Sequence, residues 1–140
     1  MNKKTLLLSL LALSFFCTGY SQTLKETRNS KKWIELPGNF GEDKNVFFIK
    51  SKYLIKEDNF ISIWVKQFST SKTPKNKYHS TVLYNLNCDT KKSKVEKIII
   101  HNLKGDITSS RSPREEWSFP VPETAGETIL NCTCELFNDK

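Results

Sequence analysis

The last part of the chain changes its hydrophobic period, and this change constrains the fold more than any other feature of the sequence. Residues 117–134 read WSFPVPETAGETILNCTC. Thr124 and Glu127 have the T-x-x-E spacing of a capping box, in which the Thr124 hydroxyl accepts a hydrogen bond from the Glu127 amide and the Glu127 carboxylate accepts one from the Thr124 amide. A helix that starts there carries one apolar stripe, formed by Ile129, Leu130, Thr133, Leu136 and Phe137. This stripe must be buried against another layer of structure.

Two cysteines on this helix, Cys132 and Cys134, follow Cys88, and the fourth cysteine, Cys17, is expected to leave with an N-terminal signal peptide. In an exported protein, three cysteines predict one disulfide and one remaining thiol. Closing a loop of more than forty residues is expected to stabilise the fold by roughly 3 to 4 kcal/mol. Cys132 and Cys134 fall on opposite flanks of the apolar stripe, so the helical period alone does not decide which of them pairs with Cys88.

The N-terminus has the pattern of a secretory signal peptide. A short basic start precedes an uninterrupted apolar run over residues 5–16. That run is too short for the roughly 20 residues of a membrane-spanning helix, and we expect cleavage between Ser21 and Gln22. Lipidation at Cys17 is disfavoured because two phenylalanines precede it, where a small residue would be needed.

The sequence predicts a signal peptide over residues 1–21, a flexible polar leader over 22–31 and one domain over 32–140. Such a length is enough for one modest core but not for two. Without Lys3 and Lys4, the mature chain has twenty basic and fifteen acidic residues, a net charge of +5. This charge favours weak attraction to anionic surfaces such as lipopolysaccharide, sulfated polysaccharide or nucleic acid.

Short runs rich in Val, Ile, Phe, Tyr and Trp alternate with polar turns in the middle of the chain, which is typical of antiparallel β-structure. The run over residues 60–68 is apolar on both faces, so we expect a central strand with a layer packed on each side. The other expected strands cover residues 33–36, 46–50, 77–87 and 95–101, with a short extension at 53–55 and a weak strand starting at Ile107. Sequential strands joined by short turns predict a meander.

Catalytic and metal sites are disfavoured. The two histidines, His79 and His101, lie outside any nucleophile-elbow or metalloprotease motif. A zinc site built from the three cysteines and a histidine is disfavoured because the side chains of a C-x-C pair on a helix point about 200° apart. The same pair lacks the C-x-x-C spacing of redox motifs. We therefore expect no enzyme activity, no catalytic or metal-binding residues and no cofactor.

Lysines gather in the expected loops, and these basic clusters remain candidates for binding. One loop carries Lys72, Lys75 and Lys77, and the next loop carries Lys91, Lys92 and Lys94. We expect a third group, Lys50, Lys52 and Lys56, at the same end of the sheet as Lys91. Consecutive loops of a meander lie at opposite ends of the sheet, so the first two clusters should not merge. A single-stranded nucleic-acid site needs aromatic residues interleaved with basic ones on an open sheet face. We expect the helix to cover the concave face and the aromatic residues to form the core, so no nucleic-acid partner is predicted.

Residues spread over the mature chain follow one more specific pattern. They are Trp33, the pair Phe47 and Phe48, the strand segment Ile63–Lys66, the run Leu86–Cys88, and a terminal set of Trp117, Pro120, Pro122, Thr124, Glu127, Leu130 and Cys134. In this order and spacing the chain resembles the surface-adhesin protein E family, also called the adhesin E-like domain. The resemblance implies an α+β fold, an antiparallel meander sheet of about six strands with a C-terminal helix tethered by a disulfide to its concave face.

The resemblance also implies the disulfide pair. The family spacing, counted from the proline before the helix cap, favours Cys88 with Cys134 and leaves Cys132 as an extra cysteine. Lys50 stands where an acidic residue is common in the family, which weakens the transfer of surface chemistry but not of the core.

By this resemblance we expect an exported, non-enzymatic binding module that adheres to host or extracellular-matrix proteins. The alternative hypothesis is a periplasmic inhibitor of an enzyme such as lysozyme, or an envelope accessory protein. In both cases the partner is a protein and no transmembrane segment remains after signal removal. The expected location is the periplasm, the cell surface or the medium, and the partner-binding residues are unknown.

Overall fold

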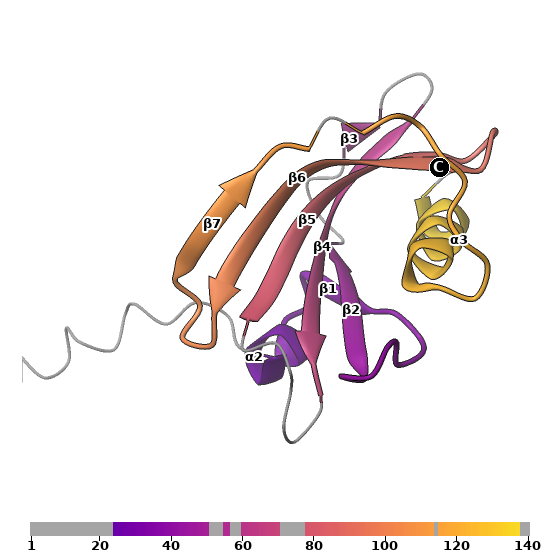
Figure 1. The fold of residues 1–140 in the computed structure, drawn as a ribbon. Helices are drawn as coiled ribbons and strands as arrows, with labels where there is room; N and C mark the ends of the chain where they lie inside the picture. The colour runs from indigo at the N-terminus through magenta and orange to yellow at the C-terminus, as the bar shows by residue number, and fades with distance from the viewer. Residues whose placement is uncertain (1–23, 51–54, 57–59, 71–77, 114, 138–140) are drawn as a thin grey trace, which may run out of the picture.

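The computed structural model describes residues 24–50, 55–56, 60–70, 78–113 and 115–137, which form one curved antiparallel sheet with a helix on its concave side (Figure 1). The strands are β1 (Trp33–Glu35), β2 (Asn45–Lys50), β3 (Ile55–Lys56), β4 (Ile61–Ser69), β5 (Tyr78–Asn87), β6 (Lys92–Asn102) and β7 (Ile107–Arg111), and the helices are α2 (Leu24–Asn29) and α3 (Ala125–Phe137). Across the sheet the order is β1, β2, β4, β5, β6 and β7, and β3 pairs with β4 off this path. The expected six-strand meander with a C-terminal helix is therefore confirmed.

Apart from shifts of one residue, the strand boundaries differ from the predicted ones in two places. β6 begins three residues before the predicted start, because residues 92–94 pair in register with residues 85–87 of β5. Backbone pairing with a neighbouring strand thus extends β6 through residues whose polar side chains gave no strand signal. Of the expected extension at 53–55, Ile55 lies in β3, and residues 53–54 lie outside the described residues.

β4 carries buried side chains on both faces, as its sequence predicted, although Phe68 is the one buried residue of β4 on the convex face. Ile61, Ile63 and Val65 belong to the core on the concave side, whereas Phe68 belongs to a second cluster on the opposite face. The concave core consists of Leu36, Phe47, Ile49, Ile61, Ile63, Val65, Leu86, Cys88, Ile129, Leu130 and Cys134. The convex cluster consists of Val46, Phe48 and Phe68, with Leu24 of α2 and Trp33 of β1 packed against it. Each face of β4 therefore has its own covering layer.

A disulfide between Cys88 and Cys134 joins the end of β5 to α3, which confirms the pair that the family resemblance implied. The two Cα atoms are 5.7 Å apart, across 46 positions of sequence. Both cysteines are buried within the concave core. Cys132 is a free, partly buried thiol, and burial followed by the charge of Glu135 raises its pKa.

The start of α3 does not form the predicted capping box. The Thr124 hydroxyl donates to the Val121 carbonyl oxygen at 2.6 Å, and the Glu127 carboxylate accepts a hydrogen bond from the Glu123 amide at 2.8 Å. Glu123 has a φ of 60°, and this left-handed conformation presents its N–H to Glu127. Glu127 therefore accepts the expected reach-back hydrogen bond, but from the amide of Glu123 instead of the amide of Thr124.

The buried stripe of α3 is also rotated from the predicted one. The buried residues are Ile129, Leu130, Thr133 and Cys134, whereas Leu136, expected in the stripe, is 39% exposed. The disulfide accounts for this difference, because it holds the Cys134 flank of the helix against the sheet and turns the Leu136 flank outward.

Part of the expected flexible leader is structured. Leu24–Asn29 form α2, in which Thr27 is completely buried and Leu24 contacts the convex cluster. The polar composition of residues 22–31 gave no sign of this contact, since a single apolar residue makes it.

Removing the disulfide should destabilise the fold strongly. For the double variant Cys88→Ala/Cys134→Ala we expect a loss of roughly 3 to 4 kcal/mol in the free energy of unfolding, because the unfolded chain regains the entropy of a 46-residue loop. Urea denaturation followed by circular dichroism measures this loss. Cys132→Ser is the control and should cost less than about 1 kcal/mol. Equal losses in the two variants would show that the cross-link contributes nothing specific.

Candidate binding surface

The structure describes only some of the residues that the sequence offered as sites. Cys88 and Cys134 have a structural role in the core, and the expected cleavage residues Ser21 and Gln22 lie outside the described residues. Within the described part of the chain, no group of three or more His, Cys, Asp or Glu side chains is arranged to hold a metal ion.

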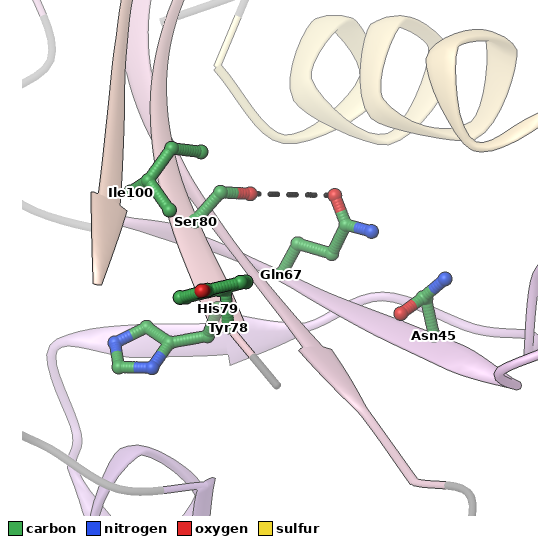
Figure 2. Close-up of a pocket in the computed structure, with 6 residues that line it drawn as sticks. All are labelled: Asn45, Gln67, Tyr78, His79, Ser80 and Ile100. Carbon is green, nitrogen blue, oxygen red and sulfur yellow. Dashed lines mark hydrogen bonds between the residues drawn. The ribbon is translucent and has the colours of Figure 1, made fainter. Parts of the chain in front are cut away.

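A pocket of about 280 Å³ opens on the concave face of the sheet, at the end where β5 begins (Figure 2). Its floor is a row of side chains that strand register brings together. Ser80 on β5 pairs with Gln67 on β4 and with Ile100 on β6, so the three side chains share one face. The Ser80 hydroxyl donates to the Gln67 side-chain oxygen at 3.4 Å. The complete lining is Asn45, Gln67, Tyr78, His79, Ser80 and Ile100.

The pocket suits hydrogen bonding to a neutral partner rather than catalysis. Asn45 and Gln67 each offer an amide donor and an amide acceptor, which match the groups of a peptide backbone. The Ser80 hydroxyl contacts an amide, which cannot act as a general base. The imidazole of His79, the next residue in sequence, points away from Gln67 and Ser80 in Figure 2. Successive residues of a strand face opposite sides of the sheet, which accounts for this separation.

Large apolar side chains are exposed at the same end of the sheet as the pocket. Tyr78, at the start of β5, is 54% exposed, and Leu103 and Ile107, which flank the β6–β7 turn, are each 64% exposed. Tyr78 pairs with Asn102 and Ile107 pairs with His101, so the three residues lie at one end of the sheet, with Tyr78 on the side of Ser80 and Ile107 on the side of the His101 ring. We call Tyr78, Leu103, Ile107 and the pocket the open-end surface. No local sequence pattern indicated this surface, because it depends on the register of three strands.

The β6–β7 turn that carries Leu103 is fixed by several hydrogen bonds. The Asn102 side chain accepts from the Asp106 amide at 2.9 Å and donates to the Asp106 carboxylate at 3.1 Å. The Gly105 amide donates to the Asn102 carbonyl at 2.9 Å, and Gly105 has a φ of 90°, which favours glycine. These contacts hold the exposed apolar side chains in place before any partner arrives.

Two histidines stack on the convex face of the sheet. The His79 ring lies between Phe68, at 4.8 Å between centroids, and His101, at 4.6 Å. The His101 Nδ1–H donates to the Gly105 carbonyl oxygen at 3.2 Å, and Nε2 lies 3.1 Å from the Thr81 hydroxyl oxygen. Burial, followed by the nearby His101 and Lys66, lowers the pKa of His79 to about 4. His79 is therefore neutral in the folded protein at neutral pH.

The expected grouping of the basic clusters lies largely outside the described residues. Lys52, Lys72, Lys75 and Lys77 lie outside the described residues. Lys92 and Lys94 lie over aromatic rings, those of Phe119 and Trp117 respectively. Lys50 shares the ring of Trp33 with Lys66, a lysine that the loop positions did not single out.

Comparison with known proteins gives a family match. The family model described as surface-adhesin protein E matches residues 33–135 of the chain. No curated protein and no solved structure matches the chain significantly. Among the described residues, no helix is both long enough and apolar enough to cross a membrane.

The stability of the domain should fall as the pH is lowered from about 6.5 to 4. In this window an unfolded histidine takes up a proton, with a pKa near 6.5, while folded His79 stays neutral. The unfolded state then binds more protons, so the free energy of unfolding decreases by about 2 kcal/mol between pH 7 and pH 4.5 through this group.

His79→Phe keeps the ring stack and removes the titrating group. Urea denaturation at the two pH values should show a smaller loss for the variant than for the wild type. Identical losses would mean that His79 has no part in the acid sensitivity.

Proposed function

The chain belongs to the surface-adhesin protein E family, and on this premise we propose that it is an exported, non-enzymatic binding module for a protein of the host surface or extracellular matrix. The family match spans nearly the whole described domain. Family membership and the disulfide together indicate an extracellular or envelope location. The expected signal peptide supports the same location.

The single observation that supports binding through the sheet is the open-end surface. α3 covers the core at Ile49, Ile63 and Leu86, which are completely buried. Further along the same face, Gln67, Ser80 and Ile100 are only partly buried and line the pocket. The helix thus leaves one end of the concave face accessible.

The chemistry of the open-end surface fits a protein partner. Protein interfaces have an apolar centre with aromatic anchors and a set of hydrogen-bonding groups around it. Tyr78 is such an anchor on the pocket side, and Leu103 and Ile107 are exposed at the same end of the sheet. The amides of Asn45 and Gln67 supply the hydrogen bonds. A rigid turn and sheet lower the entropic cost of ordering these groups on binding.

Substitutions at the open-end surface test this proposal. The mature protein should bind immobilised laminin or vitronectin in a surface plasmon resonance assay. Tyr78→Ala/Ile107→Ser should weaken that binding by about tenfold or more, because aromatic anchors dominate interface energies. Val121→Ser is the matched control, since Val121 is also largely exposed but lies outside this surface.

Two results would count against adhesion. Equal binding by the wild type and the Tyr78→Ala/Ile107→Ser variant would remove the open-end surface from the proposal. Protection of the protein from protease on intact cells, with slowing of a muramidase at stoichiometric concentration, would favour a periplasmic inhibitor instead.

A further inference from the structure

A tryptophan on the convex side of the sheet holds two lysines from different strands. The Lys66 Nζ atom lies 4.7 Å from the centroid of the Trp33 ring, and the Lys50 Nζ atom lies 5.8 Å from it. Trp33 pairs with Lys50 across β1 and β2, and Lys66 pairs with Phe48 of β2. The ring itself packs against the convex cluster. Trp33 therefore fixes two ammonium groups beside each other on a rigid sheet. We call these three residues the Trp33 site.

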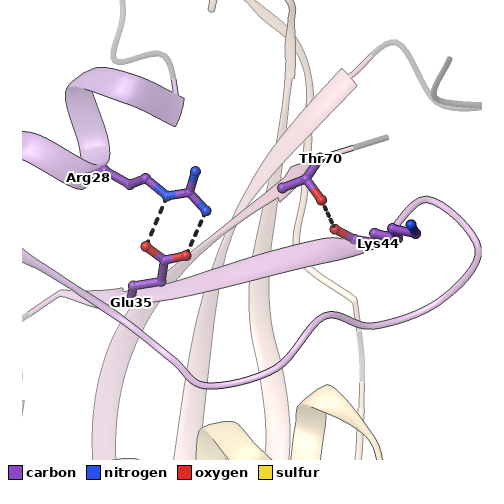
Figure 3. A network of polar contacts seen from close by, with 4 residues as sticks. All are labelled: Arg28, Glu35, Lys44 and Thr70. Carbon is purple, nitrogen blue, oxygen red and sulfur yellow. Dashed lines mark hydrogen bonds and ion pairs between the residues drawn. The ribbon is translucent and has the colours of Figure 1, made fainter. Parts of the chain in front are cut away.

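The surroundings of the Trp33 site are strongly basic. Residues 24–36 contain four basic side chains, so together with Lys50 and Lys66 there are six, against two carboxylates, Glu26 and Glu35. Glu35 accepts two hydrogen bonds from Arg28, at 2.8 and 3.0 Å, and this pair fixes α2 beside β1 (Figure 3). Figure 3 also shows the Thr70 hydroxyl donating to the Lys44 carbonyl oxygen, a contact that joins the start of β2 to the end of β4. The basic side chains are thus carried by a well-ordered part of the domain.

Further positive charge continues along the same face. Trp64 precedes Lys66 by two residues on β4, so both side chains lie on the same face. Trp64 pairs with Leu83 of β5, and Leu83 pairs with the exposed Lys97 of β6. Lys97 therefore adds one exposed basic side chain to the convex face, separated from the Trp33 site by Trp64 and Leu83.

We propose that the Trp33 site, with Lys97 further along the same face, binds a linear sulfated polysaccharide. Repeating sulfate groups on an extended chain match ammonium groups spread along a sheet face, and each can accept charge-assisted hydrogen bonds from a lysine. Trp33 acts as a positioning residue, because its ring holds the Lys50 and Lys66 ammonium groups by cation–π contact.

The geometry favours a polysaccharide over a single-stranded nucleic acid or a lipid surface. Nucleic-acid readers of this kind stack bases on free aromatic faces, whereas the Trp33 ring packs on the convex cluster and carries two lysines. Membrane-bound proteins insert exposed apolar side chains at the lipid surface. The exposed large apolar residues of the described chain are Tyr78, Leu103, Ile107, Phe119, Val121 and Leu136, and none belongs to the Trp33 site.

Binding of a heparin oligosaccharide to the mature protein, measured by isothermal titration calorimetry, tests the site. Lys50→Gln/Lys66→Gln should weaken binding by about tenfold. Lys92→Gln/Lys94→Gln is the matched control, since it removes the same charge and two lysines that also lie over aromatic rings. The control should lose less than about threefold. Lys50→Arg/Lys66→Arg keeps both charges and should retain binding.

Three results would overturn the proposal. They are no binding by the wild type, equal losses in the two glutamine variants, and tighter binding of a single-stranded DNA of similar charge through the same lysines. Unsulfated hyaluronan should bind more weakly than heparin, and equal affinity would show that sulfate is not recognised.

The Trp33 site is separate from the open-end surface, because Lys66 and Gln67 are neighbours on β4 and face opposite sides of the sheet. The variant Tyr78→Ala/Ile107→Ser should therefore bind heparin as the wild type does. A negative result for heparin binding at the Trp33 site therefore leaves the proposal for protein binding at the open-end surface unchanged, and the reverse also holds.

Discussion

Burial of β4 on both faces is the constraint on which the rest of the structure depends. An antiparallel sheet can leave one face to water, but β4 carries Ile63 and Val65 on one face and Phe68 on the other. Two covering layers are therefore required. α3 supplies the concave layer and is tied there by the Cys88–Cys134 disulfide, whereas Leu24 and Trp33 supply a smaller convex layer.

The difference in size between the sheet and its covering helix leaves room for binding. At 1.5 Å per residue, the 13 residues of α3 span about 20 Å, whereas the 11 residues of β6 span about 36 Å at 3.3 Å per residue. One helix of this length cannot cover the concave face. The tethered part of that face holds the fold together, and the uncovered end keeps Tyr78 and the pocket accessible. The part of the concave face under α3 thus stabilises the fold, and the uncovered end of the same face is available for a partner.

The sequence predicted the elements better than the surfaces between them. Alternation and turn residues are local signals, so β2, β4, β5 and α3 were found within one or two residues at most of their ends. The contact of Gln67 with Ser80 depends on how β4 and β5 align, and local patterns do not contain this register. The same holds for the Trp33 site, whose members come from β1, β2 and β4. The prediction that Leu136 belongs to the buried stripe was wrong. The helical period does not show the disulfide at Cys134, and this bond turns the Leu136 flank of α3 outward.

Like charges next to a hydrophobic cluster are a feature that folding alone does not favour. Burial, followed by the nearby Lys50, lowers the pKa of Lys66 to about 8, against the opposing effect of Glu26. The folded state therefore carries an unfavourable electrostatic term at the Trp33 site. An anionic ligand would remove that term, and since the unfolded chain does not hold the two lysines together, binding would stabilise the folded state. Perturbed ionisation at a fixed, partly buried pair of this kind is more typical of a binding site than of a surface selected for stability alone.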